Sequence, residues 1–478
     1  SQGFIHSDDH FDSVEVAYDW LRDGPTGENG YLRWKDWPSE EIGRFPLYTL
    51  SLFAVMKTYQ ASGTESLHVM MYGIRFIHML FSLIPVAVAF GIVRLVSKNY
   101  KWAVLAGLLV ALNFSLPFLG VRNLIEIVGG NLWAGALYYF YRYRHEDNDD
   151  KFLILAGVIT GFAWMIRFQI AFAALPIPFI LWYEAKAIRP AIVYSLSVGA
   201  MLFLSGLLDL IVLGSFASST VRVLTRDSSL GALYKTVPLM YPAELLAFLV
   251  PPFSILVFYL FFRPGFMKRH LLLFISSMSF IICHMSHFNQ QERFIMPIIP
   301  VMIIMAALAL WEKYKADGYI VKNKTLFKWV VIPSVAINLL LLFFMTFSSG
   351  HAGQVSPLVW MEKTKEAPSY LVFQPEVKQW MPMDYAGFET PEYAQIRKWE
   401  ELKAHLSPPW KEKEWSYFLF YPKQDDDLSR YLDSAQAVFG PLERVRDFEP
   451  SFYDNLLHLL NKRHNPSFKC YMYRPVQK

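Results

Sequence analysis

Long apolar stretches alternate with short polar connectors through the middle of the chain, and this pattern predicts a bundle of membrane-spanning helices. A full crossing takes about 20 predominantly apolar residues. Candidate stretches lie at 70–96, 102–119, 123–143, 152–166, 168–183, 188–213, 241–263, 270–287, 294–312 and 327–348. The two short stretches, 152–166 and 168–183, meet at Arg167, and we expect them to form a hairpin that reaches only part of the way across.

The two flanks of this apolar region have a different pattern. Residues 1–46 contain ten Asp or Glu against four Lys or Arg, together with aromatic side chains that suit a membrane surface. Residues 349–478 alternate turn signals with strand-like runs such as 417–421, and about 130 residues can bury a core of their own. We therefore predict a first extracytoplasmic loop with interfacial helices (1–46), a multi-span transmembrane domain (47–348) and an extracytoplasmic soluble α/β domain (349–478).

Composition agrees with a polytopic membrane protein. The chain is 54% hydrophobic and only 18% charged, against about 25% charged residues in an average soluble domain. A nucleic-acid partner is excluded, because no run of Lys and Arg is interleaved with aromatics. Cys283 lies in an apolar run and Cys470 near the end, so we expect neither a disulfide framework nor a Cys-based metal site.

Charged residues in the connectors predict the orientation. One alternating set is basic: it holds Arg94, Lys98, Lys101, Arg142, Arg144, Lys151, Lys186, Arg189, Arg263, Lys268, Arg269 and the lysines of 313–328. By the positive-inside rule this set is cytoplasmic. The opposite, non-cytoplasmic set comprises 1–46, 119–123, the tip at Arg167, 214–240, 287–293 and everything after 348.

Unusual polar groups all fall in the non-cytoplasmic set. Asp8 and Asp9 form an adjacent carboxylate pair flanked by His6 and His10. Such a pair can act as a general base, because the charge and hydrogen bonds of one carboxylate tune the basicity of the other. The alternative is a pair of solvated charges on a polar loop.

Three further polar clusters accompany the carboxylate pair. Arg122 stands with Asn123 and Glu126 at the start of a span, where a helix N-terminus favours anions. Arg167 has apolar runs on both sides, so it needs an anionic partner such as a lipid phosphate. The alternatives are a snorkelling Arg122 and a salt bridge from Arg167 to a neighbouring helix.

The last cluster runs from His284 to Phe294 and precedes two prolines that break the next helix. A dense polar string of this kind suits a binding site for a headgroup. His284 and His287 have a spacing that suits metal ligands, but a hydrogen-bonded core pair is the favoured reading. We expect no metal ion and no cofactor.

These residues resemble a known family. His6-Ser7-Asp8-Asp9-His10-Phe11 resembles the HPDE-like sequence in the first lumenal loop of family 22 GT-C glycosyltransferases, which include the mannosyltransferases of GPI-anchor and lipid-linked oligosaccharide assembly. The segment 292–300 is similar to the family's HKEERF-x-x-P-x-x-P segment. Looser matches are Ile42-Gly43-Arg44-Phe45, Arg122-Asn123, Arg167 and Leu208-Asp209 before Gly214. The order of the motifs is kept over about residues 1–310.

Departures from the family pattern bear on sugar specificity. Ser7 replaces the Pro of HPDE and Asp9 replaces its Glu, while Asn289-Gln290-Gln291 stand in place of His-Lys-Glu. The family would also have one more span before His6. The departures, together with the appended outer domain, favour a bacterial member.

The resemblance implies an inverting, metal-independent transferase that takes a sugar from a polyprenyl-phosphate donor to a lipid-linked or glycolipid acceptor. By the motif match Asp8 is the catalytic base, and Asp9 takes the second acidic position as a catalytic helper or as a group that orients the acceptor. Arg293 would bind donor phosphate or sugar hydroxyls. The remaining substrate-binding candidates are Arg44, Arg122, Arg167, Asn289, Gln291 and Glu292.

Two other classes of protein compete with the glycosyltransferase. A transporter or flippase of a lipid-linked glycan would show inverted repeats with broken helices in corresponding halves, and only one broken pair is evident. A non-catalytic membrane subunit would leave the polar clusters on one face unexplained. The expected location is a bacterial inner membrane with the site facing the periplasm, and the alternative is an endoplasmic reticulum membrane with the site facing the lumen.

Overall fold

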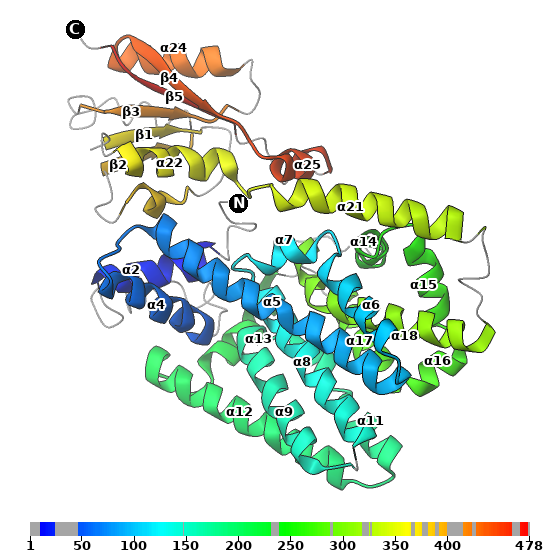
Figure 1. Ribbon diagram of the computed structural model, residues 1–478. Helices are drawn as coiled ribbons and strands as arrows, with labels where there is room; N and C mark the ends of the chain where they lie inside the picture. The colour runs from blue at the N-terminus through cyan, green and yellow to red at the C-terminus, as the bar shows by residue number, and fades with distance from the viewer. Residues whose placement is uncertain are drawn as a thin grey trace. The chain divides into compact units, whose positions relative to one another are not determined.

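The computed structural model shows a mostly helical chain with a five-stranded sheet in its C-terminal part (Figure 1). This confirms the predicted class, a helical membrane bundle with a C-terminal α/β domain. The structure describes residues 10–23, 46–146, 148–230, 239–286, 290–317, 325, 327–364, 369–374, 381–387, 392–398, 414–422, 427–460 and 469–476. The chain divides into two compact units. One contains the sheet and comprises Ser1–Arg22, Leu52–Ile74 and Phe344–Lys478; the other, the helical unit, comprises Asp23–Ser51 and Arg75–Phe343.

Helices account for the region of apolar stretches. They are α4 (Pro46–Ala61), α5 (Leu67–Ser97), α6 (Tyr100–Ala111), α7 (Leu116–Gly120), α8 (Ile125–His145), α9 (Asp150–Ile166), α10 (Ile170–Ala174), α11 (Ile177–Ala185), α12 (Arg189–Leu213), α13 (Ser218–Leu230), α14 (Met240–Phe248), α15 (Phe253–Phe261), α16 (Pro264–Arg269), α17 (Leu271–Met285), η2 (Glu292–Ile298), α18 (Ile299–Asp317), η3 (Phe327–Val331) and α21 (Ile332–Thr346).

Four helical stretches of the described chain are long and apolar enough to cross a membrane: Leu67–Ser97, Arg189–Leu213, Glu292–Lys315 and Lys328–Thr346. The bent pair α14 and α15 makes a fifth if it is counted as one broken span. Large apolar side chains such as Phe179, Ile211 and Phe343 are exposed. An extended exposed apolar surface of this kind is what contact with lipid requires.

Three of the predicted stretches are divided by the structure. The stretch 102–119 becomes α6 and α7, 168–183 becomes α10 and α11, and 241–263 becomes α14 and α15, which are bent by 116°. Pro117, Pro176 and Pro252 stand where the second helix of each pair begins. Proline has no backbone N–H and fits the first turn of a helix, so it ends one helix and begins the next.

The bundle is organised around α18, which is buried along nearly its whole length, whereas α21 is mostly exposed. Neighbouring α8, α9 and α12 lie side by side, with α9 in the middle (Figure 1). On α9, a Cβ added at Gly157 would lie 2.8 Å from the carbonyl oxygen of Tyr194 on α12. Small residues four apart, Gly157 and Gly161, thus let the two backbones approach closely.

The sheet of the other unit has the order β2-β1-β3-β5-β4. Its strands are β1 (Ser369–Phe373), β2 (Glu392–Ile396), β3 (Tyr417–Phe420), β4 (Leu442–Phe448) and β5 (Cys470–Pro475). Strand β1 pairs in parallel with β2 and β3, while β5 is antiparallel to both β3 and β4. This mixed sheet is the strand component that the runs after residue 349 predict.

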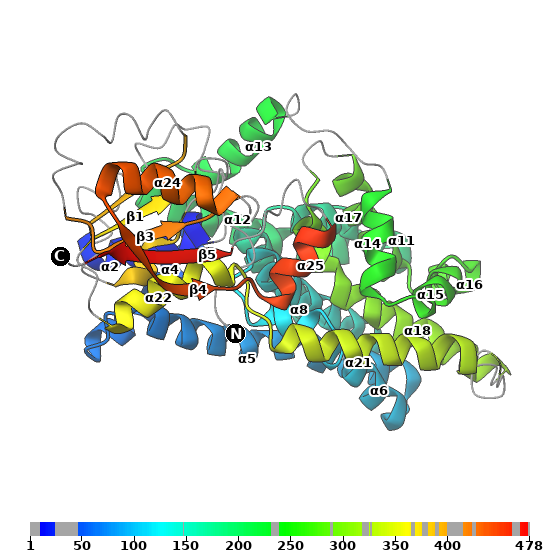
Figure 2. The same ribbon diagram turned by 90° about the horizontal axis from the view of Figure 1, so that it is seen from above.

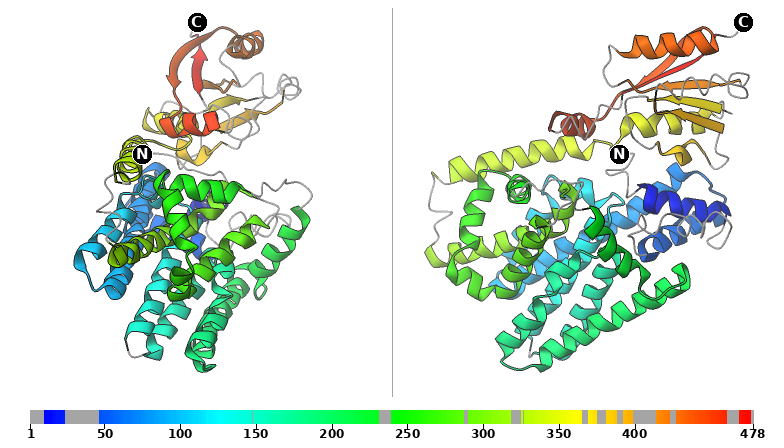
Figure 3. Two further views of the ribbon diagram at one scale, coloured as in Figure 1. Left: turned by 90° about the vertical axis from the view of Figure 1, so that its right-hand side faces the viewer. Right: turned by 180° about the vertical axis from the view of Figure 1, so that it is seen from behind.

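Helices cover both faces of the sheet. Helix α24 (Leu428–Phe439) and helix α22 (Ala352–Thr364) lie on opposite faces (Figures 2 and 3). Phe418 and Phe420 of β3 pack into the core beneath α24. Tyr417, the position before Phe418, faces the other way and meets Trp360 of α22 edge to face. Because side chains alternate along a strand, a continuous apolar run fills both cores.

Four further short helices of the described chain belong to this unit. They are η1 (His10–Glu15) and α2 (Val16–Asp23) near the N-terminus and η4 (Met383–Ala386) after β1, with α25 (Phe452–Leu460) between β4 and β5. The hydroxyl of Tyr18 in α2 donates a hydrogen bond to the carbonyl oxygen of Glu65, 2.6 Å away. Segments from both ends of the chain thus belong to one compact unit.

Candidate active site

Three charged side chains from separate segments meet inside the helical unit. Arg167 Nη2 lies 3.1 Å from Glu126 Oε1, and Arg293 Nε lies 3.6 Å from the same oxygen. The Glu126 carboxylate is completely buried, and both arginine side chains are largely buried. The structure therefore brings together three of the clusters that the sequence places on the non-cytoplasmic side.

Each member of this trio stands at the end of a helix. Glu126 is in the first turn of α8, where the helix dipole favours a negative charge. Arg167 follows the last residue of α9 in an extended conformation, and the chain turns at Phe168 and Gln169 before α10 begins. Arg293 lies in η2, which leads into the central helix α18.

Two glycines let the segments approach. A Cβ added at Gly130 of α8 would lie 2.6 Å from Cα of Pro297, and one added at Gly129 would lie 2.8 Å from Cβ of Arg167. Both distances are shorter than real Cβ contacts. The Gly129-Gly130 pair comes one turn after Glu126, and it holds α8 close to the segments that carry the two arginines. Sequence reasoning missed this role, although the glycine pair was its visible signal.

An aromatic ring and an amide lie beside the two arginines. The guanidinium carbons of Arg167 and Arg293 lie 4.9 and 5.3 Å from the ring centroid of Phe294. Arg293 Nε donates a hydrogen bond to Gln291 Oε1 over 2.9 Å. Within the trio, two positive charges face one negative charge in a site largely withdrawn from water. Such a site attracts an anion with bidentate acceptors, such as a phosphate.

Helix α14 adds two polar residues that sequence reasoning missed. The Tyr241 hydroxyl accepts a hydrogen bond from the backbone N–H of Gln291 at 3.2 Å and lies 3.3 Å from its carbonyl oxygen. One turn further, Glu244 is partly buried and interacts electrostatically with Glu292. Its Oε2 atom has no hydrogen-bond partner among the described residues. The available signal was an acidic residue inside an apolar stretch.

The other predicted site residues fall into two groups. Asp8, Asp9, Arg44 and Asn289 lie outside the described residues. Arg122 is buried just before α8, with its guanidinium 4.8 Å from the ring centroid of Phe118.

Two residues singled out by the sequence have structural explanations. His284 donates a hydrogen bond from Nδ1 to the carbonyl oxygen of Phe280 and packs against that residue's ring, with centroids 4.1 Å apart. Asp209 is buried and accepts hydrogen bonds from the backbone and hydroxyl of Ser219, at 2.9 and 2.8 Å. Asp209 thus satisfies a donor at the start of α13. No group of three His, Cys, Asp or Glu side chains that could hold a metal ion occurs in the described part of the chain.

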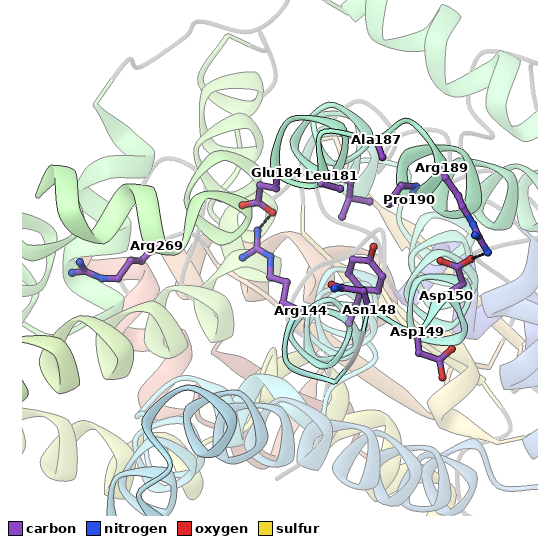
Figure 4. Close-up of a pocket in the computed structure, with 12 residues that line it drawn as sticks. Arg144, Asn148, Asp149, Asp150, Leu181, Glu184, Ala187, Arg189, Pro190 and Arg269 are labelled. Atoms are coloured by element: carbon purple, nitrogen blue, oxygen red, sulfur yellow. Dashed lines mark hydrogen bonds and ion pairs between the residues drawn. The ribbon is translucent and has the colours of Figure 1, made fainter.

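The basic connectors meet at the opposite ends of α8 and α9. They line a cavity of about 910 Å³ that includes Arg144, Asp150, Glu184, Arg189 and Arg269 (Figure 4). Its three arginines are paired with carboxylates: Arg144 with Glu184, Arg189 with Asp150, and Arg269 with Glu312. The cavity lies at the ends of α8 and α9 away from Glu126 and Arg167, and its arginines are charge-paired, whereas two arginines share the single carboxylate of Glu126 in the trio.

The fold is that of the GT-C glycosyltransferases. Over 100% of this chain and 95% of that one, it matches the crystal structure of ArnT from Cupriavidus metallidurans bound to undecaprenyl phosphate, with a TM-score of 0.58 and 12% identity. The apo structure of the same ArnT matches over 99% of this chain and 94% of that one, with a TM-score of 0.56 and 11% identity. The Archaeoglobus fulgidus oligosaccharyltransferase in complex with Zn and sulfate matches over 82% of this chain and 61% of that one, with a TM-score of 0.50 and 15% identity.

The sequence profile of the Alg9-like mannosyltransferase family matches residues 1–372. The chain belongs to this family, which confirms the resemblance seen in its motifs. It is an integral membrane glycosyltransferase. No curated protein matches the chain by sequence.

Proposed function

We propose that this enzyme transfers a sugar, mannose in keeping with its family, from a polyprenyl-phosphate donor to a lipid-linked or glycolipid acceptor on the non-cytoplasmic face. The observation that carries the proposal is the meeting of Arg167 and Arg293 on the buried carboxylate of Glu126. Two guanidinium groups in a site of low dielectric constant can stabilise the charge of a departing phosphate. Glu126 holds both groups in place until the donor arrives.

The transfer is a single displacement. The acceptor hydroxyl oxygen forms a bond to C1 of the sugar, and the bond from C1 to the phosphate oxygen breaks. The bonding electron pair leaves with the phosphate, and the hydroxyl proton passes to the carboxylate of Asp8. One displacement inverts the configuration at C1. Asp9 orients the acceptor in this scheme.

The remaining residues are proposed to line the two substrates. Gln291 positions Arg293, as their hydrogen bond supports, and Arg44, Arg122 and Asn289 contribute to the donor side. Glu292 and Glu244 accept hydrogen bonds from sugar hydroxyls. The unsatisfied Oε2 atom of Glu244 supports this last role, because a partly buried carboxylate oxygen gains from a hydroxyl donor.

The lipid part of the donor is supported by the structural comparison. ArnT, whose fold this chain shares along nearly its full length, has been crystallised with undecaprenyl phosphate. A polyprenyl phosphate combines a long apolar tail with one anionic group, and a bundle with arginines at one end suits both parts. The proposed location is a bacterial inner membrane with the site facing the periplasm, and the alternative is an endoplasmic reticulum membrane with the site facing the lumen.

The test is a transfer assay in membranes of a strain that lacks the native copy and expresses wild-type or variant protein. Radiolabelled polyprenyl-phosphate mannose is the donor, and membrane lipids provide the acceptor. Asp8→Asn and Arg293→Gln should each lower transfer at least a hundredfold, while Arg94→Gln, an exposed arginine on a basic connector, should not. Full transfer by intact Asp8→Asn protein would refute the base assignment, and transfer from nucleotide sugars alone would refute the donor class.

A flippase for a lipid-linked glycan is the second candidate. The bent pair α14 and α15 favours it, because transporters bind substrate at broken helices. A flippase would move a labelled lipid-linked glycan across vesicle membranes without forming a glycosidic bond. Retention of that movement in Asp8→Asn vesicles that form no product would support the flippase.

A further inference from the structure

A groove of about 350 Å³ lies between α22 and the end of β4 in the C-terminal part of the chain. Four residues on one face of α22, spaced over two turns, form one wall: Ser356, Val359, Trp360 and Lys363. Arg446, Asp447, Phe448 and Glu449 form the other wall. No residue of the Glu126 site lines the groove.

The aromatic wall of the groove is held in place. Trp360 is partly buried and packs edge to face on Tyr417 of β3, with ring centroids 5.7 Å apart. Phe448 at the end of β4 is buried beneath Arg446, whose guanidinium lies 5.4 Å from the ring centroid. A fixed indole beside polar groups is a surface on which the apolar face of a sugar ring can pack.

A β-bulge directs the strand wall. Strand β4 is at the edge of the sheet, and its register with β5 shifts between Arg444 and Arg446. A bulge inserts one extra residue and redirects the side chains that follow it. In this chain, the redirected residues are the ones that line the groove.

The acidic and the basic side chains of the groove differ in their partners. Asp447 receives a hydrogen bond from Arg444 at 2.8 Å, and Glu449 is paired with Lys469 at 2.9 Å. Both carboxylates are therefore neutralised by cations outside the groove. Lys363 and Arg446 are exposed: Lys363 interacts electrostatically with its chain neighbour Glu362, and the Arg446 guanidinium lies over the ring of Phe448. The groove thus places two cationic side chains next to the indole ring of Trp360.

We propose that this groove binds an anionic sugar, one that bears a phosphate or carboxylate group, as a subsite separate from the site of transfer. The sugar ring packs on Trp360, and its anionic substituent accepts hydrogen bonds from Arg446 and Lys363. A volume of about 350 Å³ is at the small end of ligand sites, which suits a single sugar residue with its substituent. The subsite does not depend on the donor or on the base proposed for transfer.

Ligand-observed saturation-transfer NMR on the full chain in nanodiscs of zwitterionic lipid tests this subsite. The probes are mannose 6-phosphate, mannose and inorganic phosphate. Mannose 6-phosphate should bind at least fivefold more tightly than either other probe, because it uses both walls. Trp360→Ala and Arg446→Gln should each weaken its binding about five- to tenfold, as expected for loss of a charge-assisted or packing contact.

The matched control is Arg474→Gln, which removes an exposed arginine on β5 that is paired with Glu443 outside the groove. It should bind mannose 6-phosphate as the wild type does. Equal binding of inorganic phosphate and mannose 6-phosphate would overturn the sugar subsite, and so would unchanged binding by Trp360→Ala. Capture of the wild type, but not Arg446→Gln, by vesicles of anionic lipid without sugar would assign the two cations to a lipid headgroup instead. Circular dichroism and melting of each variant confirm that it is folded.

Discussion

The rings of His10 and Tyr385 are stacked, with centroids 5.3 Å apart and planes 18° from parallel. His10 follows the Asp8-Asp9 pair directly, and Tyr385 lies in η4 of the C-terminal part of the chain. His10 is completely buried, so surrounding residues hold its side chain against the ring of Tyr385. The C-terminal region therefore holds the chain one residue after the proposed acids.

Tyr385→Ala should lower transfer by more than its effect on folding explains. Truncating a buried aromatic side chain costs about 3–5 kcal/mol of unfolding free energy. It also releases the segment that follows Asp9. Tyr385→Phe keeps the stack and should retain most transfer. The measurement is the transfer rate per folded molecule at a temperature well below the melting point of each variant. Equal rates for Tyr385→Ala and the wild type would show that the stack does not position the acids.

Glu126→Gln should destabilise the helical unit by about 3–5 kcal/mol, because it leaves two buried guanidinium groups facing a neutral amide. Arg293→Gln alone should cost less, since Glu126 keeps its contact with Arg167. The double variant should be more stable than the sum of the single effects predicts, by about 1 kcal/mol or more. Thermal unfolding in detergent gives the unfolding free energies of the wild type, the two single variants and the double variant, which make up this double-mutant cycle. Strict additivity would mean that Glu126 and Arg293 are not energetically coupled.

Gly130→Ala should impair both folding and transfer. The new Cβ would lie 2.6 Å from the backbone of Pro297, so α8 and η2 must move apart, at a cost of about 1–3 kcal/mol. The movement also separates Glu126 from Arg293. Gly199→Ala is the matched control: it lies within α12 with no atom within 4 Å of the added Cβ, and alanine favours a helix by about 0.5–1 kcal/mol. A melting temperature unchanged in Gly130→Ala would contradict this account.

Cys470 should make the C-terminal region sensitive to high pH. Burial raises the pKa of its thiol from 9.0 to about 12, with Asp447 adding a like-charge effect. The folded state therefore keeps the proton while the unfolded state loses it above pH 9. Stability is unaffected below pH 9 and falls between pH 9 and 12, by up to about 1.4 kcal/mol per pH unit. The rate of alkylation of Cys470 in a Cys283→Ala background, with and without denaturant, measures how often the folded C-terminal region unfolds and exposes the thiol at each pH.

The comparison for this experiment is the pH dependence of unfolding in Cys470→Ala protein. Tyrosines such as Tyr421 also have a raised pKa because of burial, so some loss above pH 9 should remain in the variant. Because Cys470 also interacts with the Tyr421 hydroxyl, the difference between the two curves gives the combined effect of losing the thiol and its interaction with Tyr421. Identical curves would rule out a contribution from Cys470.

Local patterns along the chain were sufficient for the class of fold and for the family. Runs of apolar residues predict helices because an apolar segment of that length must satisfy its own backbone hydrogen bonds within a membrane. Short apolar runs such as 417–421, bounded by turn residues, predict buried strands for a different local reason, because their length and turn flanks suit a sheet. The motifs and their order along the chain indicated the family: the resemblance seen in His6–Phe11 and in 292–300 agrees with the family whose profile matches residues 1–372.

Only the tertiary structure decided which polar residues meet. Nothing in the sequence says that Glu126, rather than a lipid phosphate, is the first partner of Arg167, because an ion pair across 41 positions depends on helix packing. Nor does it show that Gly130 must be small, that Glu244 joins the site, or that His10 stacks on Tyr385. Contacts between distant segments follow from the shape of the whole core, and a local pattern carries no information about that shape.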